Sequence, residues 1–241
     1  RILGLKARLG LHKKTKEELV PENEVLATDL RKPEYMEMQK AISKDAITLV
    51  KYKDQGVLPL TPDKYKRVMI VHVKGNGGAM GELMKAMGYG GGNPAEALKE
   101  RLCAKGFDAF IYESPIDKMK KQIAAGEKPN INLYFAGKNA IADFVSKQDA
   151  VITLFDVMTG RPSFGMSKGG GEIPWYVYEL PVVGISVNAP TMLADVPMLR
   201  TYINAYDSND DTMDALVDAL LTGPEAFKGA DPIDSYCGLW D

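Results

Sequence analysis

The sequence is poor in the residues that build covalent and metal-centred sites. It has only two cysteines and two histidines among 241 residues. Cys103 lies in a segment with helical periodicity and Cys237 near the end of the chain, so no disulfide framework is indicated, although a single bridge stays open. His72 lies inside an apolar segment and His12 in a charged one. We therefore expect no cofactor, no histidine-based metal site and no nucleophile–histidine pair.

The sequence also lacks an excess of either charge and any long hydrophobic run. Its formal net charge is −2, which gives no basic surface for nucleic acid. No apolar run approaches the roughly 20 residues that a membrane-spanning helix needs. A basic cluster within residues 1–20 is interpreted as a solvated helix end. No signal peptide is recognisable, which favours a cytoplasmic protein, but the chain opens on Arg1 rather than Met and we expect its natural start upstream.

What the sequence does contain is a series of short apolar segments typical of buried strands. Residues 150–155 and 182–187 are almost continuously apolar and rich in β-branched side chains, which predicts strands covered on both faces. Such segments alternate with helical ones, so we expect an α/β fold: a three-layer α/β/α sandwich with a mainly parallel sheet of about five to six strands. The predicted strands are 47–52, 68–73, 108–113, 150–156, 182–187 and 199–205.

Helices and segment boundaries follow from capping residues, prolines and glycines. Asn93 and Pro94 form a strong start signal for a helix that runs to about Lys105 and stops at Gly106. Further helices are predicted at 35–43, 115–125 and 139–147, and from Asp207 or Ser208 to about Gly223. Residues 1–10 are predicted to form a short helix left over from an upstream domain, residues 11–45 a polar linker with a wrapping helix, and residues 46–241 the α/β domain.

The loop that follows strand 150–156 combines residue types that suit contact with a sugar. It leaves from the carboxyl end of a central strand, where open α/β sheets bind their ligands. Its glycines, carboxyl group, guanidinium and aromatic rings suit hydrogen bonding to hydroxyls and stacking on a pyranose. One carboxyl group does not make a glycosidase, because the usual mechanism needs two. Alternatively, Trp175 and Tyr176 pack as a helical turn over the sheet. Five residues are candidates to line the rim of a site that binds a sugar substrate: Arg161, Gly170, Gly171, Glu172 and Trp175.

Two other motifs point to ligands less directly. The glycines from Gly75 to Gly81 resemble a dinucleotide-binding turn, but their spacing is G-x-G-x-x-x-G, and the acidic residue Glu113 lies nearly twice the usual distance of about 20 residues downstream. The alternative is a flexible loop at the sheet edge. Residues 207–211 begin like a calcium loop but lack its later glycine and glutamate, so a capped helix start explains them better.

Several segments together resemble glycoside hydrolase family 3. Residues 1–11, RILGLKARLGL, look like the last helix of that family's catalytic barrel. The segment DAITLVK at 45–51, followed by Leu58-Pro59-Leu60, looks like the entry into its second domain. Residues 169–177, 186–190 and 195–206 resemble the C-terminal domain of bacterial β-N-acetylglucosaminidase-type members. The resemblance covers nearly the whole chain.

The resemblance implies that this chain is the C-terminal α/β domain of a hydrolase acting on β-linked N-acetylglucosamine or a related β-glycoside. The family's aspartate nucleophile, and the Asp–His acid/base pair of its N-acetylglucosaminidase branch, lie on an upstream (β/α)8 barrel, so no catalytic residue is transferred to this chain. In β-glucosidase-type members the second domain supplies a glutamate acid/base, but the sequence around Glu172 does not match that pattern. The implied partners are the barrel and a carbohydrate, and the chain alone is expected to be inactive. The alternative is a free-standing nucleotide-binding protein that uses the loop from Gly75 to Gly81.

Overall fold

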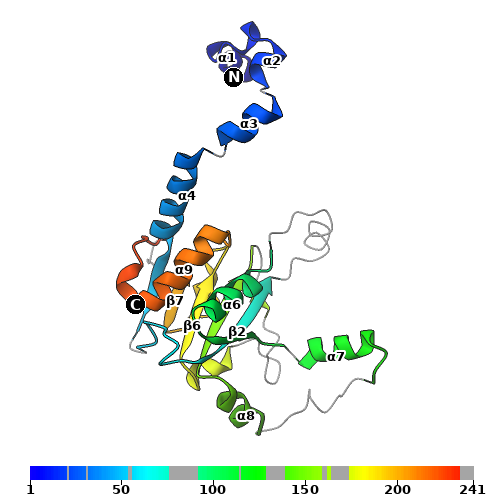
Figure 1. Cartoon of the computed structure of the whole chain (residues 1–241), viewed down its shortest axis with the longest axis vertical. Coiled ribbons are helices and arrows are strands. Elements are labelled where there is room, and N and C mark those ends of the chain that lie inside the picture. The colour runs from blue at the N-terminus through cyan, green and yellow to red at the C-terminus, as the bar shows by residue number, and fades with distance from the viewer. Residues whose placement is uncertain are drawn as a thin grey trace. The chain divides into compact units, whose positions relative to one another are not determined.

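The computed structural model describes residues 1–20, 22–30, 32–53, 56–75, 92–113, 115–128, 139–158, 162–163 and 174–233 (Figure 1). Residue contacts divide the chain into two units, Arg1–Ile42 and Ser43–Asp241. None of the helices within the described ranges is long and apolar enough to cross a membrane.

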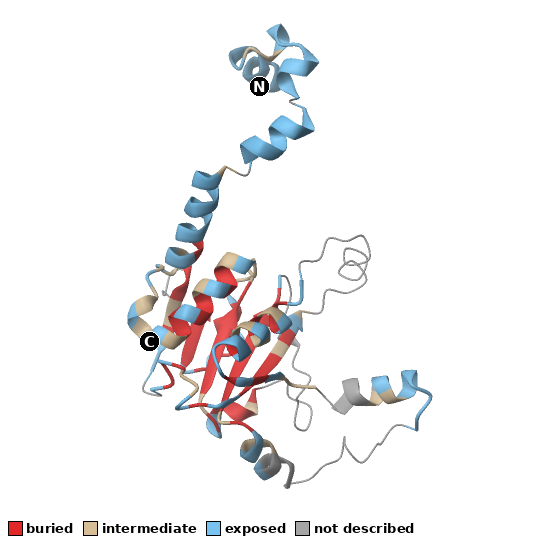
Figure 2. Ribbon diagram, viewed as in Figure 1, coloured by how far each residue is buried: buried red, intermediate tan, exposed pale blue. Residues whose placement is uncertain are grey.

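The first unit consists of short helices, and none of its described residues is buried (Figure 2). Its helices are α1 (Ile2–Arg8), the 3-10 helix η1 (Leu11–Lys13), α2 (Lys16–Leu19), α3 (Asn23–Leu30) and α4 (Pro33–Ala46), which crosses the boundary between the units. The segment predicted as a polar linker with a wrapping helix, residues 11–45, also contains the short helices α2 and α3. Thr15 and Glu18 form a capping box that starts α2, and this signal was present in the sequence.

The second unit is built around a sheet with the strand order β1-β7-β6-β4-β2-β3. Its strands are β1 (Thr48–Tyr52), β2 (Arg67–Gly75), β3 (Asp108–Ile111), β4 (Ala150–Asp156), β6 (Val182–Ser186) and β7 (Thr201–Asn204). β1 pairs antiparallel with β7, the other neighbours are parallel, and the two-residue strand β5 (Pro162–Ser163) pairs antiparallel with the end of β2. The predicted mainly parallel sheet is confirmed.

Helices cover both faces of this sheet. One face carries α6 (Pro94–Ala104) and α9 (Asp210–Thr222), which lie side by side in Figure 1. The other face is covered by α8 (Asn139–Lys147) and by the 3-10 helices η3 (Trp175–Tyr178) and η4 (Met192–Ala194). Helix α7 (Pro115–Ala124) follows β3, and the 3-10 helix η5 (Pro224–Ala226) follows α9. The predicted α/β/α sandwich is therefore confirmed.

Side chains alternate along the strands and build an apolar core on each face. Figure 2 shows the buried residues concentrated in the strands and on the inner sides of α6 and α9. Burial on both faces explains why the strand sequences are nearly continuous apolar runs. The first core includes Ile70, Ile152, Leu154, Leu98, Leu102, Leu216 and Leu220. The second includes Met69, Val71, Val151, Phe155, Tyr176, Leu199 and Tyr202.

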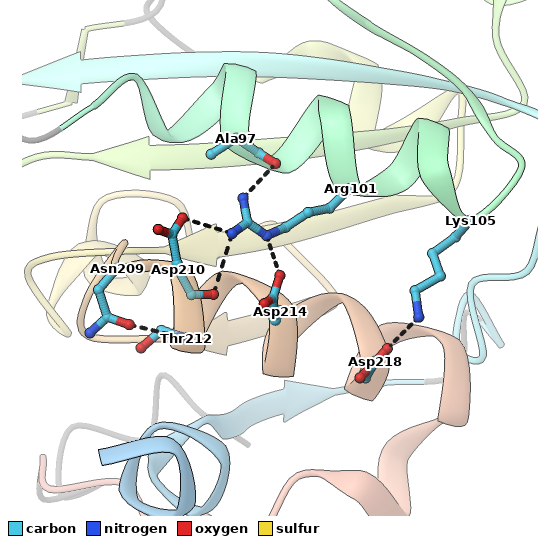
Figure 3. A network of polar contacts seen from close by, with 8 residues as sticks. All are labelled: Ala97, Arg101, Lys105, Asn209, Asp210, Thr212, Asp214 and Asp218. Atoms are coloured by element: carbon cyan, nitrogen blue, oxygen red, sulfur yellow. Dashed lines mark hydrogen bonds and ion pairs between the residues drawn. The ribbon is translucent and has the colours of Figure 1, made fainter. Parts of the chain in front are cut away.

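Ion pairs join α6 to α9 (Figure 3). The Arg101 guanidinium donates to Asp214 at 2.5 Å and to Asp210 at 2.8 Å. One turn further along α6, the Lys105 ammonium donates to Asp218 at 2.8 Å. Burial lowers the pKa of Arg101, but the hydrogen bonds from its two carboxylate partners outweigh burial and the net direction is upward. The charged pairs therefore connect the two helices at three carboxylates.

The absence of a side chain at Gly184 allows close packing of β6 and β7. A Cβ atom at this position would lie 2.6 Å from Leu199 Cδ1 and 2.8 Å from Tyr202 Cδ2. The fully buried ring of Tyr202 thus lies directly against the backbone of β6. Burial also raises the pKa of the Tyr202 phenol, so the group is neutral.

Candidate functional site

The carboxyl ends of β2 and β4 form the place where open α/β sheets usually bind a ligand. In the sheet, β2 lies between β3 and β4. The chain therefore first adds β3 on one side of β2 and then reverses direction to add β4 on the other side. Ligand sites in such sheets occur outside the carboxyl ends of the strands where this direction reverses. His72 and Lys74 lie near the end of β2, and Asp156 is the last residue of β4.

Three side chains form a hydrogen-bonded cluster at this point. His72 Nε2 lies 3.3 Å from Asp156 Oδ2, and Asn188 Nδ2 donates to Asp156 Oδ1 at 2.6 Å. The side chain of His72 is 8% exposed and that of Asp156 is 32% exposed. Lys74 lies opposite Asp156 in the parallel register. Among the described residues, the Asp156 carboxylate therefore has one partner on each oxygen, and it still reaches the surface.

The surroundings of Asp156 favour its charged form. The hydrogen bond with His72 is the largest cause and lowers the pKa of Asp156. Burial opposes this effect, while the hydrogen bond from Asn188 and the charge of Lys74 lower the pKa further. Asp156 is consequently ionised at neutral pH and acts there as a hydrogen-bond acceptor only.

The sequence alone does not predict this cluster. His72 was expected to be a buried strand residue, and it lies 84 positions from Asp156. The two meet because β2 and β4 are neighbours in the sheet. One signal was available: each of these buried strands ends in polar side chains, which converge if the strands are adjacent and parallel.

Of the predicted rim residues, the structure describes only Trp175. Arg161, Gly170, Gly171 and Glu172 lie outside the described residues, so their place at a substrate rim stays a prediction.

Trp175 opens the helix η3 within a cluster of aromatic rings. Its ring centroid lies 5.0 Å from that of Phe144 on α8 and 6.0 Å from that of Tyr176. Tyr176 is fully buried, and its hydroxyl lies 2.9 Å from Thr153 Oγ1 on β4. Burial raises the pKa of the Tyr176 phenol. The two residues thus pack as a helical turn over the sheet, which is the alternative interpretation of this motif. Trp175 itself is half-buried.

The residues behind the nucleotide-binding alternative are only partly described. Gly75 ends β2, and the rest of the glycine segment up to Gly81 lies outside the described residues. Glu113, the residue that would meet a ribose, forms an ion pair with Lys121 of α7. Nucleotide binding by this segment stays a prediction.

The acidic segment before α9 is a capped helix start. Asn209, rather than the expected Asp207 or Ser208, is the N-cap, and its side chain accepts a hydrogen bond from the Thr212 N–H at 2.8 Å. The Asp207 carboxylate accepts from the Ser208 N–H and from the Asn209 side chain, each at 2.6 Å. Within the described part of the chain, no group of three or more His, Cys, Asp or Glu side chains is arranged to hold a metal ion.

The chain is similar to enzymes that act on β-glycosides. No protein-family model matches it. It is 30% identical, over its full length, to a β-N-acetylglucosaminidase/β-glucosidase from Cellulomonas fimi, of which it covers 39%. The solved structure of the β-glucoside phosphorylase BglX matches 100% of the chain with a TM-score of 0.68 and 28% identity, and 38% of that protein is covered. A glycoside hydrolase family 3 β-N-acetylglucosaminidase from Paenibacillus sp. str. FPU-7 shares the fold over 96% of the chain, with a TM-score of 0.54 and 17% identity. The chain therefore spans about two fifths of the length of these relatives.

Proposed function

Because the chain is a partial domain of glycoside hydrolase family 3, matching the C-terminal α/β domain of its members, we propose that it is the accessory domain of an enzyme that cleaves β-linked N-acetylglucosamine or a related β-glycoside. The observation that carries the proposal is the match of the whole chain to only 39% of the Cellulomonas fimi relative. A chain that corresponds throughout to one part of such an enzyme is one domain of a larger polypeptide. The name of that relative suggests the class of substrate.

In the proposed enzyme, bond cleavage takes place on an upstream (β/α)8 barrel. A retaining glycosidase uses one carboxylate as the nucleophile that forms a covalent glycosyl-enzyme and a second carboxyl group as the acid/base. We assign neither role to a residue of this chain, so the chain alone is inactive. Its role is to support the barrel and to contribute Arg161, Gly170, Gly171, Glu172 and Trp175 to the rim of the active site.

The exposed apolar side chains of the first unit support this arrangement. Ile2 is 73% exposed, Leu3 81% and Leu30 66%. None of the described residues of this unit is buried, so its apolar side chains gain little from folding alone. Exposed apolar surface of this kind indicates contact with another folded body. The proposed partner is the barrel of the same polypeptide, whose last helix α1 resembles.

A second candidate function concerns the molecule that accepts the sugar. The phosphorylase BglX matches the full length of this chain at 28% identity. In a phosphorylase, an oxygen of inorganic phosphate rather than water attacks the glycosyl-enzyme. The new C–O bond forms as the bond to the enzyme carboxylate breaks, and the product is a sugar 1-phosphate. The parent enzyme of this chain would then degrade β-glycosides without net hydrolysis.

A single assay tests the main proposal and separates the two candidates. A chromogenic β-N-acetylglucosaminide is incubated with this chain and with the protein extended upstream of Arg1, each with and without inorganic phosphate. We expect activity only in the extended protein. Release of free sugar indicates a hydrolase, and phosphate-dependent release of sugar 1-phosphate indicates a phosphorylase. Activity in this chain alone would overturn the accessory-domain proposal, because a complete carboxylate pair would then lie within it.

The nucleotide-binding alternative has its own test. A nucleotide at about 100 times its Kd stabilises the folded protein by about 2.7 kcal/mol. An unchanged melting temperature in saturating nucleotide removes this alternative.

A further inference from the structure

The Asp156 carboxylate has hydrogen-bonding capacity that its partners among the described residues do not use. An ionised carboxylate accepts about four hydrogen bonds. The described partners, His72 and Asn188, supply one contact to each oxygen. With its side chain 32% exposed, Asp156 can direct its remaining lone pairs to a ligand at the surface.

The carboxylate is also held in a fixed orientation. His72 is almost fully buried on β2, Asp156 ends β4, and Asn188 follows β6, so three neighbouring strands of the sheet position one functional group. A polar group that rigid elements hold through hydrogen bonds to its neighbours is the arrangement expected of a binding residue. The cluster lies at the reversal of strand order, where ligands bind in this class of sheet.

The charges around the cluster decide which ligand it suits. Lys74, whose side chain is exposed, lies opposite Asp156 in register and lowers its pKa through its positive charge. The two neighbouring strands therefore present an acceptor and a donor at the same register position. A hydroxyl group donates to the first and accepts from the second, whereas a phosphate is repelled by Asp156 and a divalent cation is repelled by Lys74.

We infer that Asp156, Lys74 and Asn188 form a site in this chain that binds the hydroxyl groups of a neutral carbohydrate. The ligand class rests on the proposed function, and the place and polarity of the site rest on the geometry of the cluster. The site adjoins the predicted rim segment, because Lys74 pairs with Ser163 and Gly75 with Pro162. All three of its residues belong to this chain.

The histidines of the chain provide a direct measurement. His72 contacts Asp156, while His12 is exposed in the first unit, and the sequence has no other histidine. The imidazole NMR signals of this chain are followed while N-acetylglucosamine is added to about 0.1 M, a hundredfold above a Kd of about 1 mM. We expect the His72 signals to shift and saturate while the His12 signals stay in place. Inorganic phosphate at the same concentration should leave His72 unchanged.

Variants separate binding from folding. Asp156→Asn keeps the shape of the side chain and removes its charge, so we expect the sugar to bind about 10- to 100-fold more weakly, as for a lost hydrogen bond to a charged group. Lys74→Gln changes only an exposed side chain and should also weaken binding. Asp149→Asn, at the other end of β4, is the matched control and should bind like the wild type.

The inference is overturned if the His72 signals do not respond to the sugar, or if Lys74→Gln and a folded Asp156→Asn bind it as tightly as the wild type does. This titration uses the chain alone. The hydrolysis assay tests the activity of the extended protein, whereas the titration tests only the sugar site in this chain. A failure of one experiment therefore does not account for a failure of the other.

Discussion

Asp149 accepts two hydrogen bonds from Arg67, one from its backbone N–H at 2.8 Å and one from Nη2 at 2.7 Å. A third contact runs from Arg67 Nη1 to the carbonyl oxygen of Ser146 at 2.8 Å. Together they join the amino end of β2 to the segment that enters β4. The same two strands are joined at their carboxyl ends by His72 and Asp156. Each end of the central strand pair is therefore fixed by one aspartate.

The pair at the amino ends predicts a dependence of stability on pH. The hydrogen bonds from Arg67 lower the pKa of Asp149 below its value of about 3.9 in the unfolded chain. A group with a depressed folded pKa contributes stability above the unfolded pKa and loses it as pH falls through the folded pKa. We expect the wild type to lose more unfolding free energy than Asp149→Asn between about pH 5 and pH 2. Urea unfolding at several pH values measures this, and equal losses in the two proteins would contradict it.

A methyl group at position 184 should destabilise the second unit. Gly184→Ala places a Cβ 2.6 Å from Leu199 and 2.8 Å from Tyr202, both in the second core. Overpacking of this kind costs about 1–3 kcal/mol. Gly4→Ala is the control, because nothing lies within 4 Å of a Cβ at that helical position. Thermal unfolding should show a lower Tm for the first variant and no loss for the second.

The ion pairs between α6 and α9 should contribute unequally. The Arg101 side chain is 20% exposed and contacts two carboxylates, whereas the Lys105 side chain is 47% exposed and contacts one. We expect Arg101→Ala to lower the unfolding free energy by about 1–2 kcal/mol, since hydrogen bonds with charged groups are lost beside the core. Lys105→Ala should have a smaller effect that disappears in high salt. Equal losses in urea unfolding would show that burial does not set the contribution of these pairs.

The rim prediction is tested in the protein extended upstream of Arg1. Trp175→Phe keeps an aromatic ring against Phe144 and should leave the Tm nearly unchanged. Because both Trp175 and Glu172 are proposed to meet the substrate, we expect kcat/KM to fall with Trp175→Phe and with Glu172→Gln. Unchanged kcat/KM in both variants would leave Trp175 with its packing role alone.

The sequence predicts the sheet well because its strands are buried on both faces. Both ends of β4 are predicted correctly, at 150 and 156. Six consecutive side chains of this strand are buried and the seventh, Asp156, is partly buried. The helix α6 is predicted within one residue at each end by Asn93, Pro94 and Gly106, and the Asn93 side chain accepts from the Ala95 N–H as an N-cap does. These signals are local, so a single sequence contains them.

Features that depend on contacts between distant segments are not predicted. The cluster of His72, Asp156 and Asn188 requires the order of strands in the sheet, which no local pattern specifies. The start of α9 shows a smaller limit. Three consecutive residues can each cap a helix, and the structure selects Asn209. The antiparallel direction of β1 is also a property of the whole sheet.

The position of β1 has a consequence for synthesis of the protein. Among the described strands, β1 leaves the ribosome first and its partner β7 last, and Thr48 pairs with Asn204. Contacts this far apart in sequence form late and slow the folding of a domain. β1 therefore lacks its native partner until β7 has been translated. A ribosome that stalls before β7 would release a chain whose first strand is open to pairing with other chains.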